Sequence, residues 1–201
     1  MHIHKIIRRK SEIIDVTVRV FSGIFWLLVL FGFDSVGGAL MTLLAAVIHE
    51  TGHILALFVL GHTDGVPLPR MPGFSIGIHP SLSYKEDIAV SVAGPVANLV
   101  TAAMLLPMRE AAWEMIAISL LTALSNLLPV KGYDGYRILS ALIALTGTEG
   151  ILGRLPGILS FAIATAAVLL SLYAIYAFDA GYWIFGVFFI FLLGEVKNSL
   201  K

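Results

Sequence analysis

Long apolar runs, each close to the length of a membrane-spanning helix, restrict what this chain can fold into. Of its 201 residues, 58% are hydrophobic and 13% are charged, and the mean hydropathy is +0.93. Soluble domains contain about 45–50% apolar and about 25% charged residues. So few charges could not cover a soluble globule of this length. We therefore expect an integral, multi-pass membrane protein with a single domain.

The charge balance and the absence of cysteine exclude several classes of function. The net charge is +0, so no nucleic-acid partner is expected. The sequence contains no cysteine. Disulfides, thiolate metal sites and a cysteine nucleophile are therefore ruled out.

The apolar runs predict an all-α polytopic membrane protein with about six transmembrane helices. We place these spans at Val16–Phe33, Val36–Leu60, Ile88–Met108, Trp113–Leu128, Ile158–Phe178 and Ala180–Gly194. A broken helix is expected near 126–135, with a short helix at Tyr136–Thr146 after it. Weak alternation over Phe74–His79 is compatible with a short β element near 74–79.

The whole of 1–201 is interpreted as one membrane-embedded domain. Residues 1–15 form a basic tail, residues 16–194 form the membrane core, and no appended soluble domain is expected. With a cytosolic N-terminus, every Lys and Arg except Arg109 falls on the cytosolic side of the six spans. This bias predicts that both termini are cytosolic.

Within the second apolar run, His49-Glu50-Thr51-Gly52-His53 forms an H-E-x-x-H motif on a predicted helix. Residues four apart share one helical face, so both imidazoles can converge on a zinc ion, beside which Glu50 can act as a general base. The same motif arises by chance on exposed faces of soluble helices. Here it lies in an apolar run, where three ionisable side chains are costly and usually functional.

A catalytic zinc ion needs a third protein ligand, and Asp134 is the candidate. Pro129, Gly132 and Gly135 predict that the helix breaks around it. Irregular backbone at membrane depth is tolerated only where it is buried or lines a watery cavity. The alternative is a plain turn at the membrane surface, with Asp134 as a turn or N-cap residue. The first interpretation implies one Zn2+ per chain, in a site open toward the cytosolic side.

Three motifs in order resemble those of the site-2 protease family of intramembrane zinc metalloproteases. They are His49-Glu50-Thr51-Gly52-His53, then Ala93-Gly94-Pro95 followed by Asn98, then Asn126-Leu127-Leu128-Pro129-Val130-Lys131-Gly132-Tyr133-Asp134-Gly135, which has the family's N-x-x-P-x-x-x-x-D-G pattern. The resemblance covers about residues 16–194. The subgroup that looks most similar is the small, six-span sporulation-factor-processing type.

This resemblance implies a role for each matching residue. His49, His53 and Asp134 would bind zinc, Glu50 would be the general base, and Asn126 would hold the substrate or the developing oxyanion. The activity implied is hydrolysis of a peptide bond in or near a transmembrane segment of another membrane protein, as in regulated intramembrane proteolysis. A regulatory membrane partner is compatible with this activity.

Other positions bear on substrate binding and on the fit to the family. Asn98 can hydrogen-bond across helices or to the substrate, whereas Ala93-Gly94-Pro95 is interpreted as a packing notch of small residues. Ile76 lies in the predicted strand, which could pair with an unwound substrate as an added strand. Many relatives have Leu and a second Gly where this chain has Tyr133 and Tyr136.

Two other functions use the same residues. A transmembrane metal transporter would need a polar path that continues to the outer side, but the stretch 36–47 offers only Thr42 as a polar side chain. An inactive relative that only binds membrane proteins would not need Glu50, which is present.

The predicted orientation can be tested by cysteine labelling, because the chain has no native cysteine. Cysteines introduced at Ser35 and Asp179 should react with a membrane-impermeant maleimide added outside. Cysteines at Ser83 and Thr148 should react only from the cytosolic side. Labelling of Ser35→Cys from the cytosol would overturn the orientation.

Overall fold

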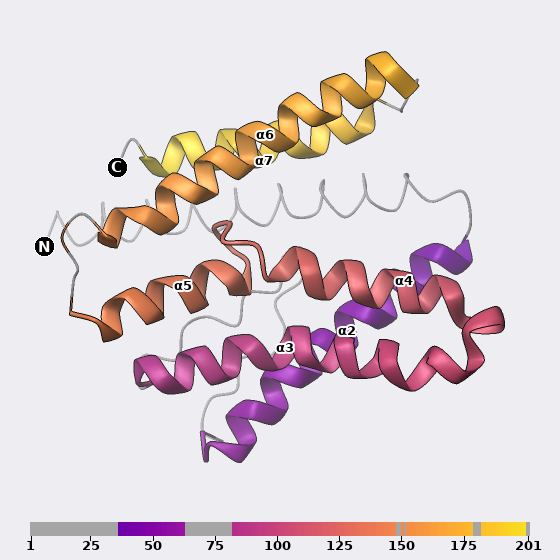
Figure 1. Cartoon of the computed structure of the whole chain (residues 1–201), viewed down its shortest axis with the longest axis horizontal. Helices are drawn as coiled ribbons and strands as arrows, with labels where there is room; N and C mark the ends of the chain where they lie inside the picture. The colour runs from indigo at the N-terminus through magenta and orange to yellow at the C-terminus, as the bar shows by residue number, and fades with distance from the viewer. Residues whose placement is uncertain (1–35, 63–81, 148–149, 151, 179–181, 200–201) are drawn as a thin grey trace, which may run out of the picture.

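Helices make up all the regular structure of the described part of the chain. The computed structural model describes residues 36–62, 82–147, 150, 152–178 and 182–199. Its elements are α2 (Val36–Val59), α3 (Tyr84–Leu105), η1 (Leu106–Met108), α4 (Arg109–Asn126), α5 (Asp134–Leu145), η2 (Leu152–Arg154), α6 (Leu155–Phe178) and α7 (Trp183–Ser199). The prediction of an all-α protein is confirmed for these residues (Figure 1).

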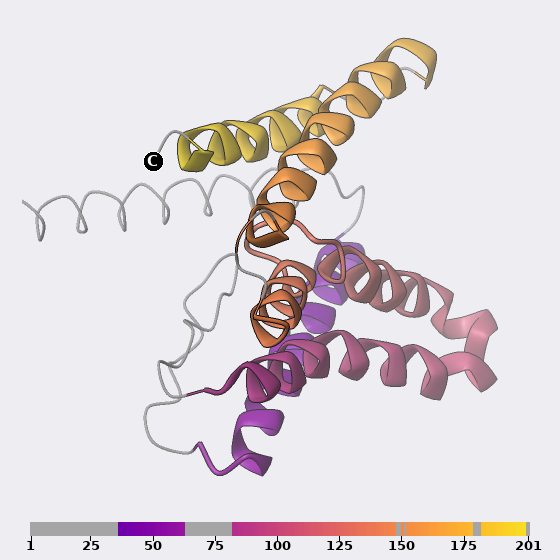
Figure 2. The ribbon, with the colours of Figure 1, turned by 60° about the vertical axis from the view of Figure 1, so that its left-hand side comes forward.

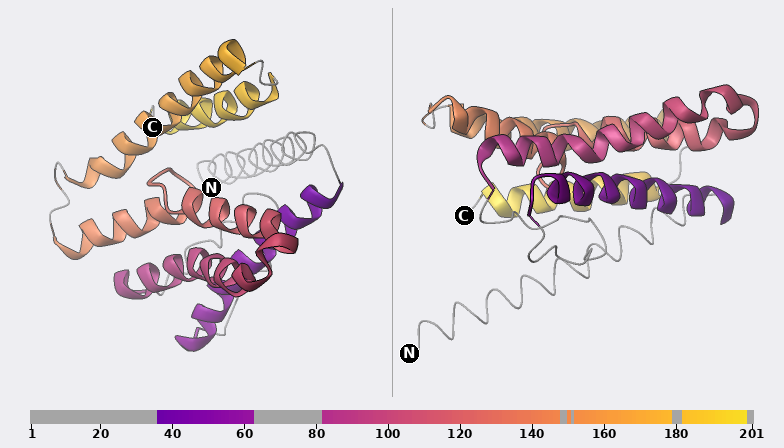
Figure 3. Two further views of the ribbon diagram at one scale, coloured as in Figure 1. Left: turned by 45° about the vertical axis from the view of Figure 1, so that its right-hand side comes forward. Right: turned by 90° about the horizontal axis from the view of Figure 1, so that it is seen from below.

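Helices α2, α3 and α4 form the central packing unit. Helices α3 and α4 fold back on each other around η1, and α2 lies across both of them (Figure 3). Helix α5 continues beyond the end of α4 and packs chiefly on α3 (Figure 1). This arrangement brings α2, which carries the H-E-x-x-H motif, and α5, which begins at Asp134, against the same central helix.

Helices α6 and α7 form an antiparallel pair that lies to one side of α2–α5 (Figure 2). The pair is joined to the rest of the molecule near the turn that precedes α5. The backbone N–H of Lys131 donates to Oγ of Ser160 on α6 at 2.8 Å. The ring of Tyr133 lies 5.8 Å from that of Phe191 on α7. Tyr133 therefore packs on α7.

Three helical stretches of the described chain are long and apolar enough to cross a membrane. They are Val36–Val59, Tyr84–Asn126 and Leu152–Phe178, and the second folds back on itself at η1. The spans predicted at Val36–Leu60, Ile88–Met108, Trp113–Leu128 and Ile158–Phe178 coincide with α2, α3, α4 and α6. The structure thus supports an integral membrane protein, while a total of six spans stays a prediction.

Several predictions concern residues outside the described part of the chain. The basic tail at 1–15, the first predicted span at Val16–Phe33 and the β element near 74–79 all fall there. The last predicted span, Ala180–Gly194, corresponds to α7, which begins at Trp183 and continues to Ser199.

Small buried residues let α2, α3 and α4 approach closely. A Cβ atom at Gly52 of α2 would overlap the carbonyl oxygen of Ala93 on α3 and come within 2.9 Å of the Cβ of Ala97. Ala45 on α2 and Ala123 on α4 are completely buried. Small residues at membrane-helix contacts permit backbone approach that larger side chains would prevent. This close packing places side chains of α2 directly against the α3 backbone.

A local sequence signal fixes the start of α3. Ser83 and Glu86 form a capping box, in which the Ser83 N–H donates to Oε2 of Glu86 at 2.8 Å and the Glu86 N–H donates to Oγ of Ser83 at 3.4 Å. Oε1 of Glu86 also lies 3.4 Å from Nε2 of His62, just beyond α2. The box satisfies N–H groups that a helix start leaves without intrahelical partners.

The expected helix break near 126–135 is present. Helix α4 ends at Asn126, and α5 starts at Asp134 after a turn in which Gly132 has φ +93°. A positive φ favours glycine, which has no Cβ to clash with the backbone. Gly135 packs so closely on the turn that an added Cβ would overlap the carbonyl oxygens of Leu127 and Leu128. The turn and the first residues of α5 therefore form one tightly packed unit.

Gly135→Ala should destabilise this unit, because the methyl group would meet backbone oxygens that cannot rotate away. Overpacking of this kind typically costs about 1–3 kcal/mol. We expect a lower thermal unfolding temperature in detergent micelles. The matched control is Gly157→Ala in α6, where nothing lies within 4 Å of an added Cβ. An unchanged unfolding temperature for Gly135→Ala would contradict the packing described here.

Candidate metal centre

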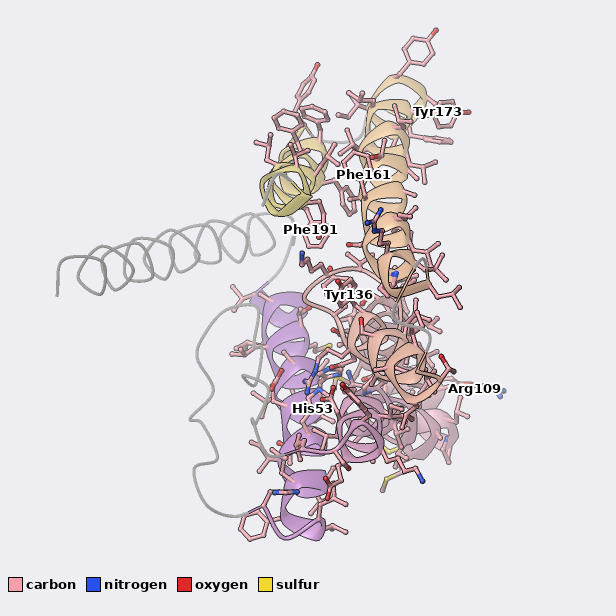
Figure 4. The ribbon with its side chains drawn as sticks, turned by 90° about the vertical axis from the view of Figure 1, so that its left-hand side faces the viewer. His53, Arg109, Tyr136, Phe161, Tyr173 and Phe191 are labelled. Carbon is pink, nitrogen blue, oxygen red and sulfur yellow. The ribbon has the colours of Figure 1, made fainter. Side chains whose placement is uncertain are left out.

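Helix α2 carries three ionisable side chains that are buried inside the helical unit. His49, Glu50 and His53 are only 5%, 8% and 4% exposed, and one potential ligand atom from each lies within 4.8 Å of the other two. His49 and His53 are four residues apart, so one helical face presents both rings. Figure 4 shows His53 on the side of α2 that faces α3 and α5.

Asp134 reaches the same point from α5. Its Oδ2 atom lies 3.0 Å from Nε2 of His49 and 3.3 Å from Nε2 of His53, and the residue is only 6% exposed. It is the first residue of α5, and the N-cap position is occupied by Tyr133, which makes no capping hydrogen bond through its side chain. A surface turn or N-cap role therefore does not describe Asp134. A carboxylate at a helix N-terminus is also stabilised by the helix dipole.

The three donor atoms form a triangle that matches a tetrahedral metal site. The two Nε2 atoms lie 3.2 Å apart, and each is 3.0 or 3.3 Å from Oδ2 of Asp134. Ligand atoms at about 2.0–2.1 Å from a tetrahedral zinc ion are separated by about 3.3 Å. Two imidazole nitrogens and a carboxylate oxygen are also ligand types that zinc accepts. The residues present therefore fit a bound metal ion without rearrangement.

A hydrogen bond to α3 orients the ring of His53. Nδ1 of His53 donates to the carbonyl oxygen of Val90 at 2.7 Å. A carbonyl can only accept, so the proton of a neutral His53 resides on Nδ1. Nε2 then presents its lone pair toward His49 and Asp134. Metal-binding histidines are commonly oriented in this way by a backbone carbonyl.

Gly94 on α3 leaves the space that the two rings occupy. A Cβ atom at this position would overlap Nε2 and Cε1 of His53 and lie 2.8 Å from Nε2 of His49. The sequence predicted that Ala93-Gly94-Pro95 is a packing notch. At Gly94, the neighbours that need this space are the imidazole rings of His49 and His53, which the notch admits.

Glu50 is close to the triangle but is not part of it. Its ligand atom lies within 4.8 Å of both histidines, whereas Asp134 approaches them at 3.0 and 3.3 Å. Asp134 as the third metal ligand stays a prediction, which these two distances support. Oε2 of Glu50 is buried and has no hydrogen-bond partner among the described residues, so it can accept a proton.

The other residues selected from the sequence occupy different surroundings. Asn126, the last residue of α4, donates from Nδ2 to the carbonyl oxygen of Thr122 at 2.9 Å and is half-buried. Asn98 is completely buried one turn beyond Gly94, and its amide atoms have no partner among the described residues. Ile76 lies outside the described part of the chain. Substrate contacts by these three residues stay predictions.

Two contributions to the site have no counterpart in the sequence predictions. The carbonyl of Val90 holds His53, but a backbone acceptor carries no residue-type signal. Asp87 on α3 forms an ion pair with Arg137 on α5, with 17% and 18% of the two side chains exposed. Arg137 follows Asp134 by three residues, one helical turn away. A charged residue at this spacing from the predicted ligand is the sequence feature that could have pointed to Arg137.

The fold of the chain is similar to that of a solved site-2 protease. No protein-family model and no curated protein sequence matches the chain. Among solved structures, the chain is similar to a structure described as the site-2 protease from Methanocaldococcus jannaschii, with a TM-score of 0.63 and 19% sequence identity. The match covers 89% of this chain and 88% of the other. At this identity the comparison shows a shared fold.

Gly94→Ala should weaken metal binding, because the added methyl group would overlap Nε2 and Cε1 of His53 and displace the imidazole rings. Disturbing a residue that orients metal ligands typically costs about 10–100-fold in metal affinity. The measurement is zinc affinity of the purified chain by competition with a chromophoric chelator. Gly157→Ala, which introduces the same methyl group into open space, should bind zinc as the wild type does. Wild-type affinity in Gly94→Ala would contradict the proposed position of the metal.

Proposed function

We propose that this chain is an intramembrane zinc metalloprotease of the site-2 protease type. It would hydrolyse a peptide bond in or near a transmembrane segment of another membrane protein. The observation that carries the proposal is the buried triangle of Nε2 of His49, Nε2 of His53 and Oδ2 of Asp134, in a fold similar to that of a site-2 protease.

His49, His53 and Asp134 would hold one zinc ion per chain. When bound, zinc supplies a Lewis acid that polarises the scissile carbonyl and makes water more acidic. Val90 keeps His53 in the tautomer that this role requires. The packing of α2 and α5 against α3 holds the three ligands in place before the metal arrives.

Glu50 would transfer the proton. As a water oxygen bonds to the carbonyl carbon of the substrate, Glu50 accepts one proton from that water. The carbon–nitrogen bond then breaks, and Glu50 returns the proton to the leaving amine, which leaves a new carboxyl terminus and a new amino terminus. The buried and unpartnered Oε2 atom supports this assignment, since no protein hydrogen bond competes for it among the described residues.

Asn126 would stabilise the negative charge that develops on the carbonyl oxygen. Its amide nitrogen carries two hydrogens, and the bond to Thr122 uses one of them. Amide donors aimed at a developing oxyanion are a common source of rate enhancement. A substrate helix hides its amides in internal hydrogen bonds, so the scissile segment must unwind. The segment that contains Ile76 is proposed to pair with it as an added strand.

The finer assignments are also proposals. Six spans, cytosolic termini and a site open to the cytosol are supported by the Lys and Arg bias of the sequence and by the three membrane-length helical stretches. The order of the three motifs supports the small sporulation-factor-processing type. A regulatory membrane partner would be consistent with regulated intramembrane proteolysis.

The transporter alternative receives little support from α2. On the N-terminal side of His49, the buried residues of this helix are Gly38 and Ala45. The hydroxyl of Thr42 donates to the carbonyl oxygen of Gly38 at 2.9 Å, within the helix. This half of α2 thus provides no side chain for a second metal position.

Glu50→Gln and Asp134→Asn separate the base from the ligand. Glu50→Gln keeps the shape of the side chain but cannot accept the proton, so zinc should be retained while cleavage falls by about 10²–10⁴-fold. Asp134→Asn weakens a ligand, so both zinc content and cleavage should fall. Zinc content is measured by elemental analysis, and cleavage by proteomics of membrane fractions from cells that express each variant.

The control for both variants is His49→Ala with His53→Ala, which should lose zinc altogether. Stoichiometric zinc in that double variant would show that the metal binds elsewhere. Metal-free Glu50→Gln together with fully loaded Asp134→Asn would mean that the two carboxylates have exchanged roles. Normal cleavage by Glu50→Gln would reject the protease and favour transport.

A further inference from the structure

Asp87 and Arg137 form a polar contact between the two helices that flank the metal centre. The guanidinium of Arg137 donates through an Nη atom to Oδ1 of Asp87. Less than a fifth of the surface of each side chain is exposed. An ion pair in such surroundings is screened less than one on the surface, and removing one partner leaves a poorly solvated charge.

The pair lies one helical turn from the metal centre on both helices. On α5, Arg137 follows the ligand Asp134 by three residues. On α3, Asp87 precedes Val90, the acceptor for His53, by three residues. Residues three apart on a helix are surface neighbours. Helix α3 therefore holds His53 through Val90 and holds α5 through Asp87.

These contacts close a ring. The carboxylate of Asp134 meets His53, His53 donates to Val90, and α3 leads from Val90 back to Asp87. Asp87 binds Arg137, and α5 leads back to Asp134. Each step is either a direct contact or one turn of helix. A shift of α5 relative to α3 would break the ion pair and move Oδ2 of Asp134 away from the histidines together.

Helix α5 is also held by helix packing and by the close contacts of its first turn. The helix packs chiefly on α3, and its first turn is joined to α4 through the close approach of Gly135 to Leu127 and Leu128. That approach fixes the start of α5 relative to the end of α4. The ion pair adds a charged side-chain contact between α3 and α5, one helical turn from Asp134.

We propose that the Asp87–Arg137 ion pair is a positioning device for the metal centre, which holds α5 on α3 so that Asp134 stays within bonding reach of the metal. Neither residue touches the metal or the substrate. The proposal rests on the metal site of the proposed function, but not on the peptidase activity.

Zinc affinity in a double-mutant cycle tests this proposal. Asp87→Asn and Arg137→Gln in the full-length chain should each lower zinc affinity, by about 10–100-fold as for other supports of metal ligands. Both changes remove the same contact. The double variant should therefore bind zinc with about the affinity of whichever single variant has the lower zinc affinity. Arg137→Lys keeps the charge and should recover part of the affinity. Losses that multiply in the double variant would overturn the proposal.

The absorption spectrum of bound Co2+ provides a second readout, because it responds to the number and geometry of the ligands. Asp87→Asn and Arg137→Gln should shift the visible bands toward those of Asp134→Asn. The matched control is Glu86→Gln, which changes the neighbouring carboxylate on α3 but keeps a residue that can complete the capping box. It should match the wild type in zinc affinity and in spectrum.

The remaining outcomes are distinguishable. If the wild type and Asp134→Asn bind zinc equally, the metal site of the proposed function is wrong. If Asp134→Asn loses zinc but the Asp87 and Arg137 variants keep wild-type affinity and spectrum, only the positioning role is wrong. If these variants lose helical circular dichroism along with zinc, the ion pair serves the folding of the bundle, and the positioning role is also rejected.

Discussion

The cost of burying charge among apolar helices is the constraint on which this structure depends. His49, Glu50, His53 and Asp134 are all less than a tenth exposed, and buried ionisable groups without compensation are strongly destabilising. The protein supplies part of the compensation through Val90. In the proposed function, a divalent cation at the centre of the donor triangle would add to this compensation, because it would neutralise the Asp134 carboxylate and bind Nε2 of both histidines. The same buried side chains would therefore affect both the stability of the fold and the proposed chemistry.

Glycine residues allow the helices to approach closely enough for the buried side chains of α2 and α5 to meet. Three helices must come close enough for side chains from α2 and α5 to meet beside α3, and each approach passes over a residue without a Cβ. Gly52 admits the α3 backbone, Gly94 admits the two imidazoles, and Gly135 admits the turn after α4. Glycine lowers helix propensity by about 1 kcal/mol relative to alanine. Inside α2 and α3 this cost is offset by contacts that no larger residue would allow.

The sequence predicted the features that depend on periodicity and on residue type. The H-E-x-x-H spacing predicted that His49 and His53 lie on one helical face. Pro129 and Gly132 predicted the helix break between α4 and Asp134. The sequence could not predict the acceptor for His53, because every residue has a carbonyl. It also could not pair Asp87 with Arg137, because their contact depends on how α5 lies on α3. The sequence predicted that Asn98 would hydrogen-bond across helices or to the substrate. It did not predict that the Asn98 amide is buried without a hydrogen-bond partner among the described residues.

The donor triangle also bears on how the protein is made. His49 and Asp134 are separated by 85 residues. During synthesis, the two histidines of α2 enter the membrane well before α5 exists, so the nascent chain first offers a two-donor site. The third donor arrives only after the α3–α4 hairpin and the turn that follows it have been completed. For the proposed zinc site, tight metal loading would consequently be a late step of biogenesis, because a chain that stops short of Asp134 lacks the third donor.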